Sequence, residues 1–173
     1  MPRKLIKRFL PTPEKIKNQK GLHLLGDWLH DPNLWHINRV SVSRAFAVGL
    51  FMAFVPLPTQ MVMAAALAVW FRCNLALSVA LVWVTNPVTM PVIFYGTYKF
   101  GTLLLNTPPT DFVFELTWEW LGSELASIWQ PFLLGCFVSG LIAAFIGMYG
   151  SSLLWRWHVV HRWQKRKLER QKA

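Results

Sequence analysis

The second long apolar run of this sequence is interrupted at Thr85-Asn86-Pro87-Val88-Thr89-Met90-Pro91. The run extends from Leu75 to Phe100, and about 20 apolar residues are enough for a helix to cross a bilayer. Each proline removes a backbone donor and disfavours the helical conformation of the residue before it, so the stretch predicts a broken helix. Carbonyl groups freed in lipid need partners inside the protein, which makes the break a candidate functional feature.

An earlier apolar run has the same design. It extends from Ala45 to Phe71 and is interrupted at Pro56-Leu57-Pro58-Thr59-Gln60. Each of its halves reaches about halfway through a hydrocarbon core of about 30 Å. A third run, from Pro131 to Trp155, is uninterrupted and long enough to span. The fold class predicted is an all-α integral membrane protein with two broken helices and one continuous transmembrane helix. The residues expected to break the two helices are Pro56, Pro58, Pro87 and Pro91.

Positive charge is concentrated at the two ends of the chain. The formal net charge is +10 at pH 7, although 54% of the residues are hydrophobic. The segments 1–44 and 156–173 each carry a net charge of +6, whereas 45–155 carries −2. Long apolar runs argue against a nucleic-acid-binding protein with basic tails. The positive-inside rule predicts a multi-pass membrane protein with both termini in the cytoplasm. No cleavable signal peptide is expected, because the first apolar run begins about 45 residues into the chain.

These features divide the chain into three parts. They are a basic amphipathic segment (1–44), a membrane domain (45–155) and a basic cytoplasmic tail (156–173). Within the membrane domain, the expected units are 45–71, 75–105, an extracytoplasmic loop at 106–130 and the helix 131–155. Amphipathic helices are expected near the N-terminus, where Arg3–Leu10 is a surface helix or a solvated tail, and in 111–130, which has no Lys or Arg and several Trp.

A parity argument gives the topology. Two cytoplasmic ends and an external 106–130 region require an odd number of crossings between 45 and 105. One broken run therefore enters and leaves on the same side. A cytoplasmic Arg72 makes 45–71 the re-entrant hairpin and 75–105 the kinked crossing. Ser41 or Ser43 is expected to cap the first membrane helix, and Asn86 with Pro87 to start a half-helix at the second break.

The candidate site consists of uncharged polar residues at the two breaks and arginines at the rim of the hairpin. If both breaks lie near mid-membrane, their polar groups form a cluster beside helix N-termini, a device that transporters use for ions and anionic groups. The alternative is that these side chains only satisfy carbonyls freed by proline. The arginines are expected to hold phosphate head groups or to snorkel to water. The site residues predicted are Thr59, Gln60, Thr85, Asn86, Thr89, Arg44 and Arg72.

A ladder of small residues marks one face of the third run, and it permits close helix packing. Its members are Gly135, Ser139, Ala143, Gly147 and Ser151. The ladder is expected to seat the broken helices or to form a dimer face. Neither Cys73 nor Cys136 has the context of a disulfide or a metal ligand, and no metal or cofactor is predicted.

The sequence also resembles the bacterial inner-membrane family catalogued as domain of unknown function 2062, over about residues 20 to 155. The resemblance rests on Ser41-Val42-Ser43-Arg44, Ala47-Val48-Gly49-Leu50-Phe51, Pro56-Leu57-Pro58-Thr59-Gln60-Met61, Asn74, Trp83-Val84-Thr85-Asn86-Pro87-Val88-Thr89-Met90-Pro91, Tyr95 and Gly101. Family members often have glycine where this chain has Thr59. The family has no established activity. Its fusion to glycosyltransferase-type modules in some bacteria implies a link to envelope lipid or glycan metabolism, and no such module is present here.

Two function classes follow. The first is a protein that handles or transports lipid or an envelope precursor through the polar site at the breaks. The second is a non-catalytic scaffold or accessory subunit of an envelope-glycan or lipid-modifying system. No catalytic residue is predicted, because none of the polar residues at the breaks has an adjacent His, Asp or Glu. The expected partners are anionic membrane lipids, a second copy of the chain or an envelope-biosynthesis protein, and nucleic acid is not expected.

Overall fold

The computed structural model describes residues 32–35, 37–108 and 118–172. Every element in these ranges is a helix, so the all-α prediction is confirmed for the described part of the chain. The elements are η2 (Pro32–Trp35), α3 (Arg39–Ala53), α4 (Gln60–Trp70), α5 (Leu75–Val82), α6 (Met90–Leu105) and α7 (Trp118–Lys172). The surface helix expected at Arg3–Leu10 and the beginning of the 111–130 region lie outside the described residues.

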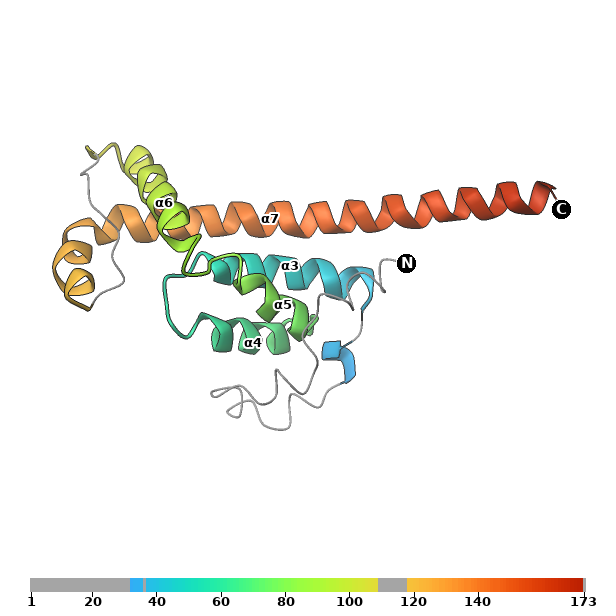
Figure 1. The fold of residues 1–173 in the computed structure, drawn as a ribbon, viewed down its shortest axis with the longest axis horizontal. Coiled ribbons are helices and arrows are strands. Elements are labelled where there is room, and N and C mark those ends of the chain that lie inside the picture. Colours follow the sequence, from blue (N-terminus) through green and yellow to red (C-terminus); the bar gives the residue numbers. More distant parts are fainter. Residues whose placement is uncertain (1–31, 36, 109–117, 173) are drawn as a thin grey trace.

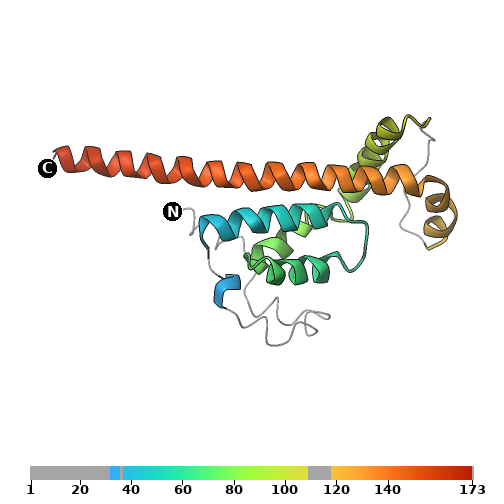
Figure 2. The ribbon, with the colours of Figure 1, turned by 180° about the vertical axis from the view of Figure 1, so that it is seen from behind.

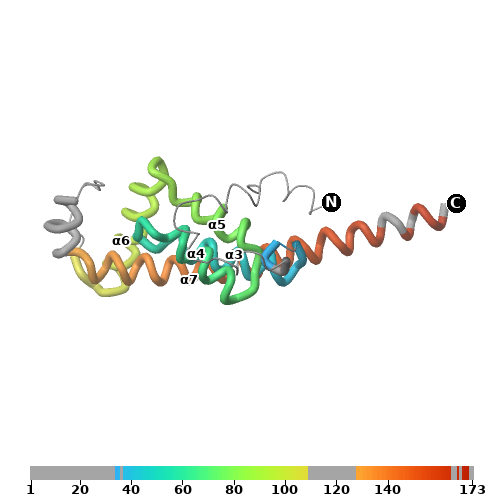
Figure 3. The backbone as a smooth tube through the Cα atoms, turned by 90° about the horizontal axis from the view of Figure 1, so that it is seen from below, coloured from blue at the N-terminus to red at the C-terminus, as the bar shows by residue number. Residues whose placement is uncertain are grey.

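The long helix α7 forms one side of the molecule, and the other helices pack along part of its length (Figures 1 and 2). α3 lies beside α7 and runs in the opposite direction, with α4 and α5 on the far side of α3. α6 crosses α7 nearer to the N-terminal end of α7, and the view from below separates α6 from the α3–α4–α5 group (Figure 3). The C-terminal part of α7 extends beyond α3.

The first apolar run folds as a helical hairpin. α3 ends at Ala53 and α4 begins at Gln60, so the run is interrupted around Pro56 and Pro58. The start of α3 corrects one prediction. Asn38 caps the helix by accepting the backbone N–H of Ser41 at 2.7 Å, whereas Ser41 and Ser43 lie inside the helix. Asn38 has the better position because its side chain precedes the first helical residue, as a cap must.

The second apolar run is also divided, with α5 ending at Val82 and α6 beginning at Met90. The half-helix was expected to start at Pro87, and the regular helix begins three residues later. Residues 87–89 instead form a turn that leads directly into α6, because the Met90 N–H donates to the Asn86 carbonyl at 2.8 Å. Asn86 therefore caps this leading turn, and the helix follows it.

α7 lacks the two boundaries expected at 131 and 155. It is one helix of 55 residues with Pro131 inside it. A proline in a helix removes the hydrogen bond to the carbonyl four residues earlier and can bend the helix, and Figure 1 shows that the N-terminal part of α7 is bent away from the rest of the helix. Residues 156–172 contain neither Gly nor Pro, so nothing in the sequence separates the basic tail from the apolar helix before it.

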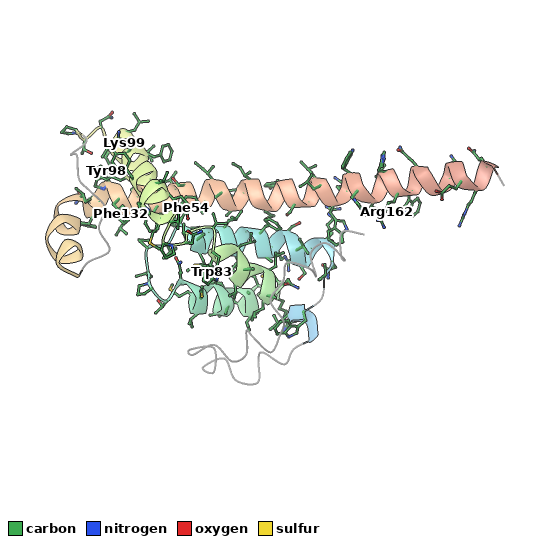
Figure 4. All side chains as sticks on the ribbon, viewed as in Figure 1. Phe54, Trp83, Tyr98, Lys99, Phe132 and Arg162 are labelled. Carbon is green, nitrogen blue, oxygen red and sulfur yellow. The ribbon has the colours of Figure 1, made fainter. Side chains whose placement is uncertain are left out.

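Glycine residues allow close approach at two helix crossings, α3 with α5 and α6 with α7. A Cβ added at Gly49 of α3 would lie 2.6 Å from the carbonyl oxygen of Ser78 on α5. At the α6–α7 crossing, a Cβ at Gly101 would collide with the Pro131 carbonyl, and a Cβ at Gly135 with the Thr97 carbonyl. The two backbones therefore touch, and Tyr98 and Phe132 pack beside the contact (Figure 4).

Among the described helices, one is long and apolar enough to cross a membrane. It covers Ile128–Gln171, and 22% of its most apolar 18-residue window is buried within the protein. Large apolar side chains are also exposed on other helices, including Trp70, Val92 and Leu103, and on the turn before α6, at Val88. Extended exposed apolar surface of this kind marks a face that contacts lipid or another protein.

Candidate functional site

The two helix breaks lie side by side and are joined by a hydrogen bond. The hydroxyl of Thr85, in the second break, donates to the carbonyl oxygen of Ala53, the last residue of α3, at 2.7 Å. It also lies 3.1 Å from the Val82 carbonyl at the end of α5. Thr85 is 4% exposed and Ala53 is fully buried. One side chain thus serves a freed carbonyl from each of the two broken helices.

Asn86 and Thr89 cap the second break reciprocally. The Asn86 Oδ1 accepts the backbone N–H groups of Val88 and Thr89 at 2.9 and 3.0 Å. The Thr89 hydroxyl accepts the Asn86 N–H at 3.0 Å and donates to the Val84 carbonyl at 2.7 Å. This exchange is the geometry of a capping box. The polar atoms of Asn86 and Thr89 are therefore largely occupied by the backbone of their own turn.

The polar residues of the first break lie apart from this network. Thr59 is exposed at the tip of the hairpin with Leu57 and Pro58, and its hydroxyl lies 3.8 Å from the Met63 sulfur. Thr59 precedes α4 but makes no side-chain cap. Gln60 is half-buried, and within the described part of the chain no hydrogen bond joins it to Asn86 or Thr89. The structure thus brings Thr85, Asn86 and Thr89 together and leaves Thr59 and Gln60 at a separate tip.

Both breaks lie near the middle of the section of α7 that contacts the other helices. A Cβ added at Gly140 would lie 3.2 Å from Phe54, which follows α3 directly (Figure 4). The start of α3 contacts α7 twelve residues further on, where the Arg39 Nε donates to the Ser152 hydroxyl at 3.0 Å. Twelve helical residues correspond to about 18 Å, and Ile128 lies the same distance from Gly140 in the other direction.

Arg44 and Arg72 both lie at the end of the hairpin opposite its tip. The Arg44 guanidinium donates to the Phe71 carbonyl at 3.5 Å, and Arg72 is the next residue in the chain. Both arginine side chains are exposed. Arg39 lies at the same end through its bond to Ser152, and the basic tail continues beyond that level, with Arg162 visible on it (Figure 4).

The small-residue ladder of α7 contacts two helices of the same chain. Gly135 lies against Thr97 and Gly101 of α6, and a Cβ at Gly147 would collide with Leu50 of α3. Gly140, which lies outside the ladder, packs against α3 as well. Ser139 and Ala143 are half-buried. The Ser151 hydroxyl donates within α7 to the Met148 carbonyl at 3.1 Å.

Two buried polar residues have structural roles that the sequence analysis did not predict. Asn74 is 1% exposed and caps α5 through the Leu77 N–H at 2.9 Å, while its own N–H donates to the Ser41 carbonyl at 3.4 Å. Ser78 is fully buried, and its hydroxyl lies 3.4 Å from the Ala45 carbonyl. The position of Asn74 before an apolar run is a cap signal, whereas no local pattern announces Ser78.

The chemistry available at the breaks is hydrogen bonding by hydroxyl, carboxamide and backbone groups. The described residues of the breaks include no His, Asp or Glu to activate a nucleophile. Within the described ranges, no three His, Cys, Asp or Glu side chains are grouped so that they could share a metal ion. The contacts that the structure shows at the breaks are hydrogen bonds of this kind.

In its described part the chain is all-helical, with one helix able to span a membrane and two apolar runs that are broken at prolines and meet at their breaks. Residues 22–164 match the family described as "Uncharacterized protein conserved in bacteria (DUF2062)", and the chain belongs to that family. The match agrees with the range of the resemblance read from the proline motifs and extends it along α7 from about residue 155 to residue 164. No curated protein and no solved structure matches the chain.

Proposed function

We propose that this chain is a multi-pass protein of the bacterial inner membrane that handles a lipid or an envelope precursor at the level where its two broken helices meet. The observation that carries the proposal is the hydrogen bond from Thr85 to Ala53, which fixes both breaks at one level. That level lies about 18 Å along α7 from each end of the packed section, close to the midplane of a hydrocarbon core of about 30 Å.

The directions of the helices support a specific topology. α3 and α4 leave from and return to the end that carries Arg39, Arg44 and Arg72, and this path supports a re-entrant hairpin. α5 and α6 continue past the break to Leu105, and α7 returns. Because the basic tail also lies at the arginine end, the positive-inside rule assigns that end and both termini to the cytoplasm.

The tip of the α3–α4 hairpin carries the polar groups that we propose contact the cargo. Thr59 and Pro58 are exposed where the proposed topology places lipid, and exposed polar backbone at membrane depth is tolerated where it lines a cavity or contacts protein. Secondary transporters place unwound backbone and half-helix ends at this depth to bind their cargo. We therefore assign the polar contact with the cargo to Thr59 and Gln60, whose side chains are not part of the Asn86–Thr89 cap.

Reconstitution tests the proposal. The full chain in liposomes should accelerate the exchange of a fluorescent phospholipid between leaflets, measured with a membrane-impermeant reductant. Thr59→Val and Gln60→Ala should slow the exchange while retaining thermal stability. Thr107→Ala, at an exposed position after α6, is the matched control and should behave as the wild type.

A scaffold function is the second candidate, and a specific observation favours it. Thr85, Asn86 and Thr89 are occupied by carbonyl and N–H groups of the breaks, as residues with a purely structural role would be. A scaffold predicts no lipid exchange above protein-free liposomes, and a growth defect that appears only when a variant lowers the amount of folded protein. A growth defect in Gln60→Ala at normal expression would contradict it.

A further inference from the structure

The end of the hairpin near Arg44 and Arg72 has the features of an anion site. The Arg44 guanidinium donates to the carbonyl of Phe71, the residue that follows α4, at 3.5 Å. A guanidinium carries five N–H donors, so most of those of Arg44 remain available beside Arg72. Planar guanidinium groups bind phosphate through paired hydrogen bonds. A phosphate group is therefore the ligand that Arg44 and Arg72 would favour.

No carboxylate in the described part of the chain neutralises these arginines. Segments 32–35 and 37–108 contain three Arg and one Lys but no Asp or Glu. The acidic residues of the remaining described range, 118–172, are Glu119, Glu124 and Glu169. The first two precede the α6–α7 crossing, at the far end of α7, and the third lies near its last turn. Within the described residues, the pair therefore has no anionic neighbour.

The backbone at Arg72 provides a second observation. Arg72 has φ 47°, in the left-handed region, where it closes the C-terminal turn of α4 with the Cys73 N–H donating to the Ala68 carbonyl at 2.9 Å. Glycine or asparagine normally occupies this position, as Asn106 does at the end of α6. A long side chain in this conformation costs free energy, so its presence points to a role for the side chain itself.

Two exposed aromatic residues lie next to Arg72 in the chain. Trp70 is 82% exposed and Phe71 is 50% exposed, and they directly precede Arg72. Exposed aromatic residues beside arginine are typical of the membrane–water interface, where a phospholipid carries its phosphate. We propose that Arg44 and Arg72 bind the phosphate of an anionic phospholipid in the cytoplasmic leaflet. This inference deepens the proposed function and rests on its membrane orientation.

A structural role for the same residues makes a different prediction. If Arg44 only caps α4 and Arg72 only extends to water, the protein has no specific binding site for the anion here. Arg72→Gly separates the two cases, because it relieves the left-handed conformation and removes the cation. Both cases predict equal or higher thermal stability, with a rise in Tm of about 2–4 °C for each kcal/mol gained. Only the lipid site predicts that the stabler protein binds lipid less well.

The experiment uses the full chain in dodecyl maltoside with added phosphatidylglycerol. Native mass spectrometry counts the bound lipid, and a thermal melt follows stabilisation by the lipid. Arg44→Gln, Arg72→Gly and Arg72→Asn should each weaken phosphatidylglycerol binding about tenfold, the effect of losing one charge-assisted hydrogen bond. The matched control is Arg162→Gln, which removes one positive charge from the part of α7 beyond the hairpin and should leave binding unchanged.

Three outcomes would overturn the inference. They are wild-type binding in Arg72→Gly, an equal loss in Arg162→Gln, which would mean general attraction to positive charge, and equal stabilisation by inorganic phosphate, which would mean a site for a free anion. The proposed function has a separate test in the labelling of Arg72→Cys. Labelling from outside the cell would reject the topology, whereas labelling from the cytoplasm with unchanged lipid binding would reject only the arginine site.

Discussion

The contact between α6 and α7 makes a sharp prediction about Gly135. In an isolated helix, Gly→Ala is stabilising by about 1 kcal/mol because alanine loses less backbone entropy. At Gly135 the added methyl group would meet the carbonyl of Thr97, a backbone atom that cannot rotate aside as a side chain can. We therefore expect α6 to move away from α7.

The magnitude follows from what that movement disturbs. Overpacking in a close contact costs about 1–3 kcal/mol. The upper value is expected here, because α6 would also lose the 3.4 Å contact of Thr97 with the Cys136 sulfur and the edge-to-face packing of Phe94 on Phe132. After the helix-propensity gain of about 1 kcal/mol, the net loss is about 2 kcal/mol. For a chain of this size, that loss lowers Tm by about 4–8 °C.

A thermal melt in detergent measures the effect, and α7 offers a matched control. Gly150 lies on the same helix with no atom within 4 Å of the position of its missing Cβ. Gly150→Ala should therefore show the propensity gain alone, with a rise in Tm of about 2–4 °C. Opposite signs for the two variants are the expected result. A rise in Tm for Gly135→Ala would refute the close contact between α6 and α7.

Three further predictions concern the breaks and the topology. Thr85→Val should lower the free energy of unfolding by about 1–3 kcal/mol, because it leaves the buried Ala53 carbonyl without its donor, while Thr59→Val at the exposed tip should change it by less than about 0.5 kcal/mol. Gln60→Ala and Asn86→Ala should have effects on stability that add within about 0.3–0.5 kcal/mol, since no described hydrogen bond joins the two residues, and a larger coupling in a double-mutant cycle would mean that the breaks share one site. A cysteine at position 72 should be labelled from the cytoplasm and Ser123→Cys from outside, and labelling of Ser123→Cys from the cytoplasm would reject the topology.

Local chemistry explains why part of the candidate site was predictable. The capping role of Asn86 follows from its place before Pro87, and its partner Thr89 lies three residues later, at the spacing of a capping box. The choice of Ser41 or Ser43 as a cap failed by a few residues, because several residues near the start of α3 carry a capping side chain and only the backbone identifies which one precedes the helix.

The meeting of the breaks was only partly predictable. The sequence indicates two interrupted helices of similar length, which suggests interruptions at one depth. The sequence does not show which residues of the two breaks touch. The cluster expected if the breaks met contained Thr59, Gln60, Thr85, Asn86 and Thr89, and the contact observed between the breaks is that of Thr85 with Ala53. Which face of a half-helix turns inward depends on neighbours far away in the sequence, and these were unknown.

The sequence by itself determined the helices, their two breaks and the concentration of positive charge at the chain ends, since prolines, caps and apolar runs act within a few residues. Only the tertiary structure decided that α3 and α4 form a hairpin against α7, that Gly101 and Gly135 bring two backbones into contact, and that Arg44 reaches the end of α4. Those arrangements depend on the shapes of surfaces that are distant in the chain. A pattern of small and large residues permits close packing but does not identify the helix that packs against it.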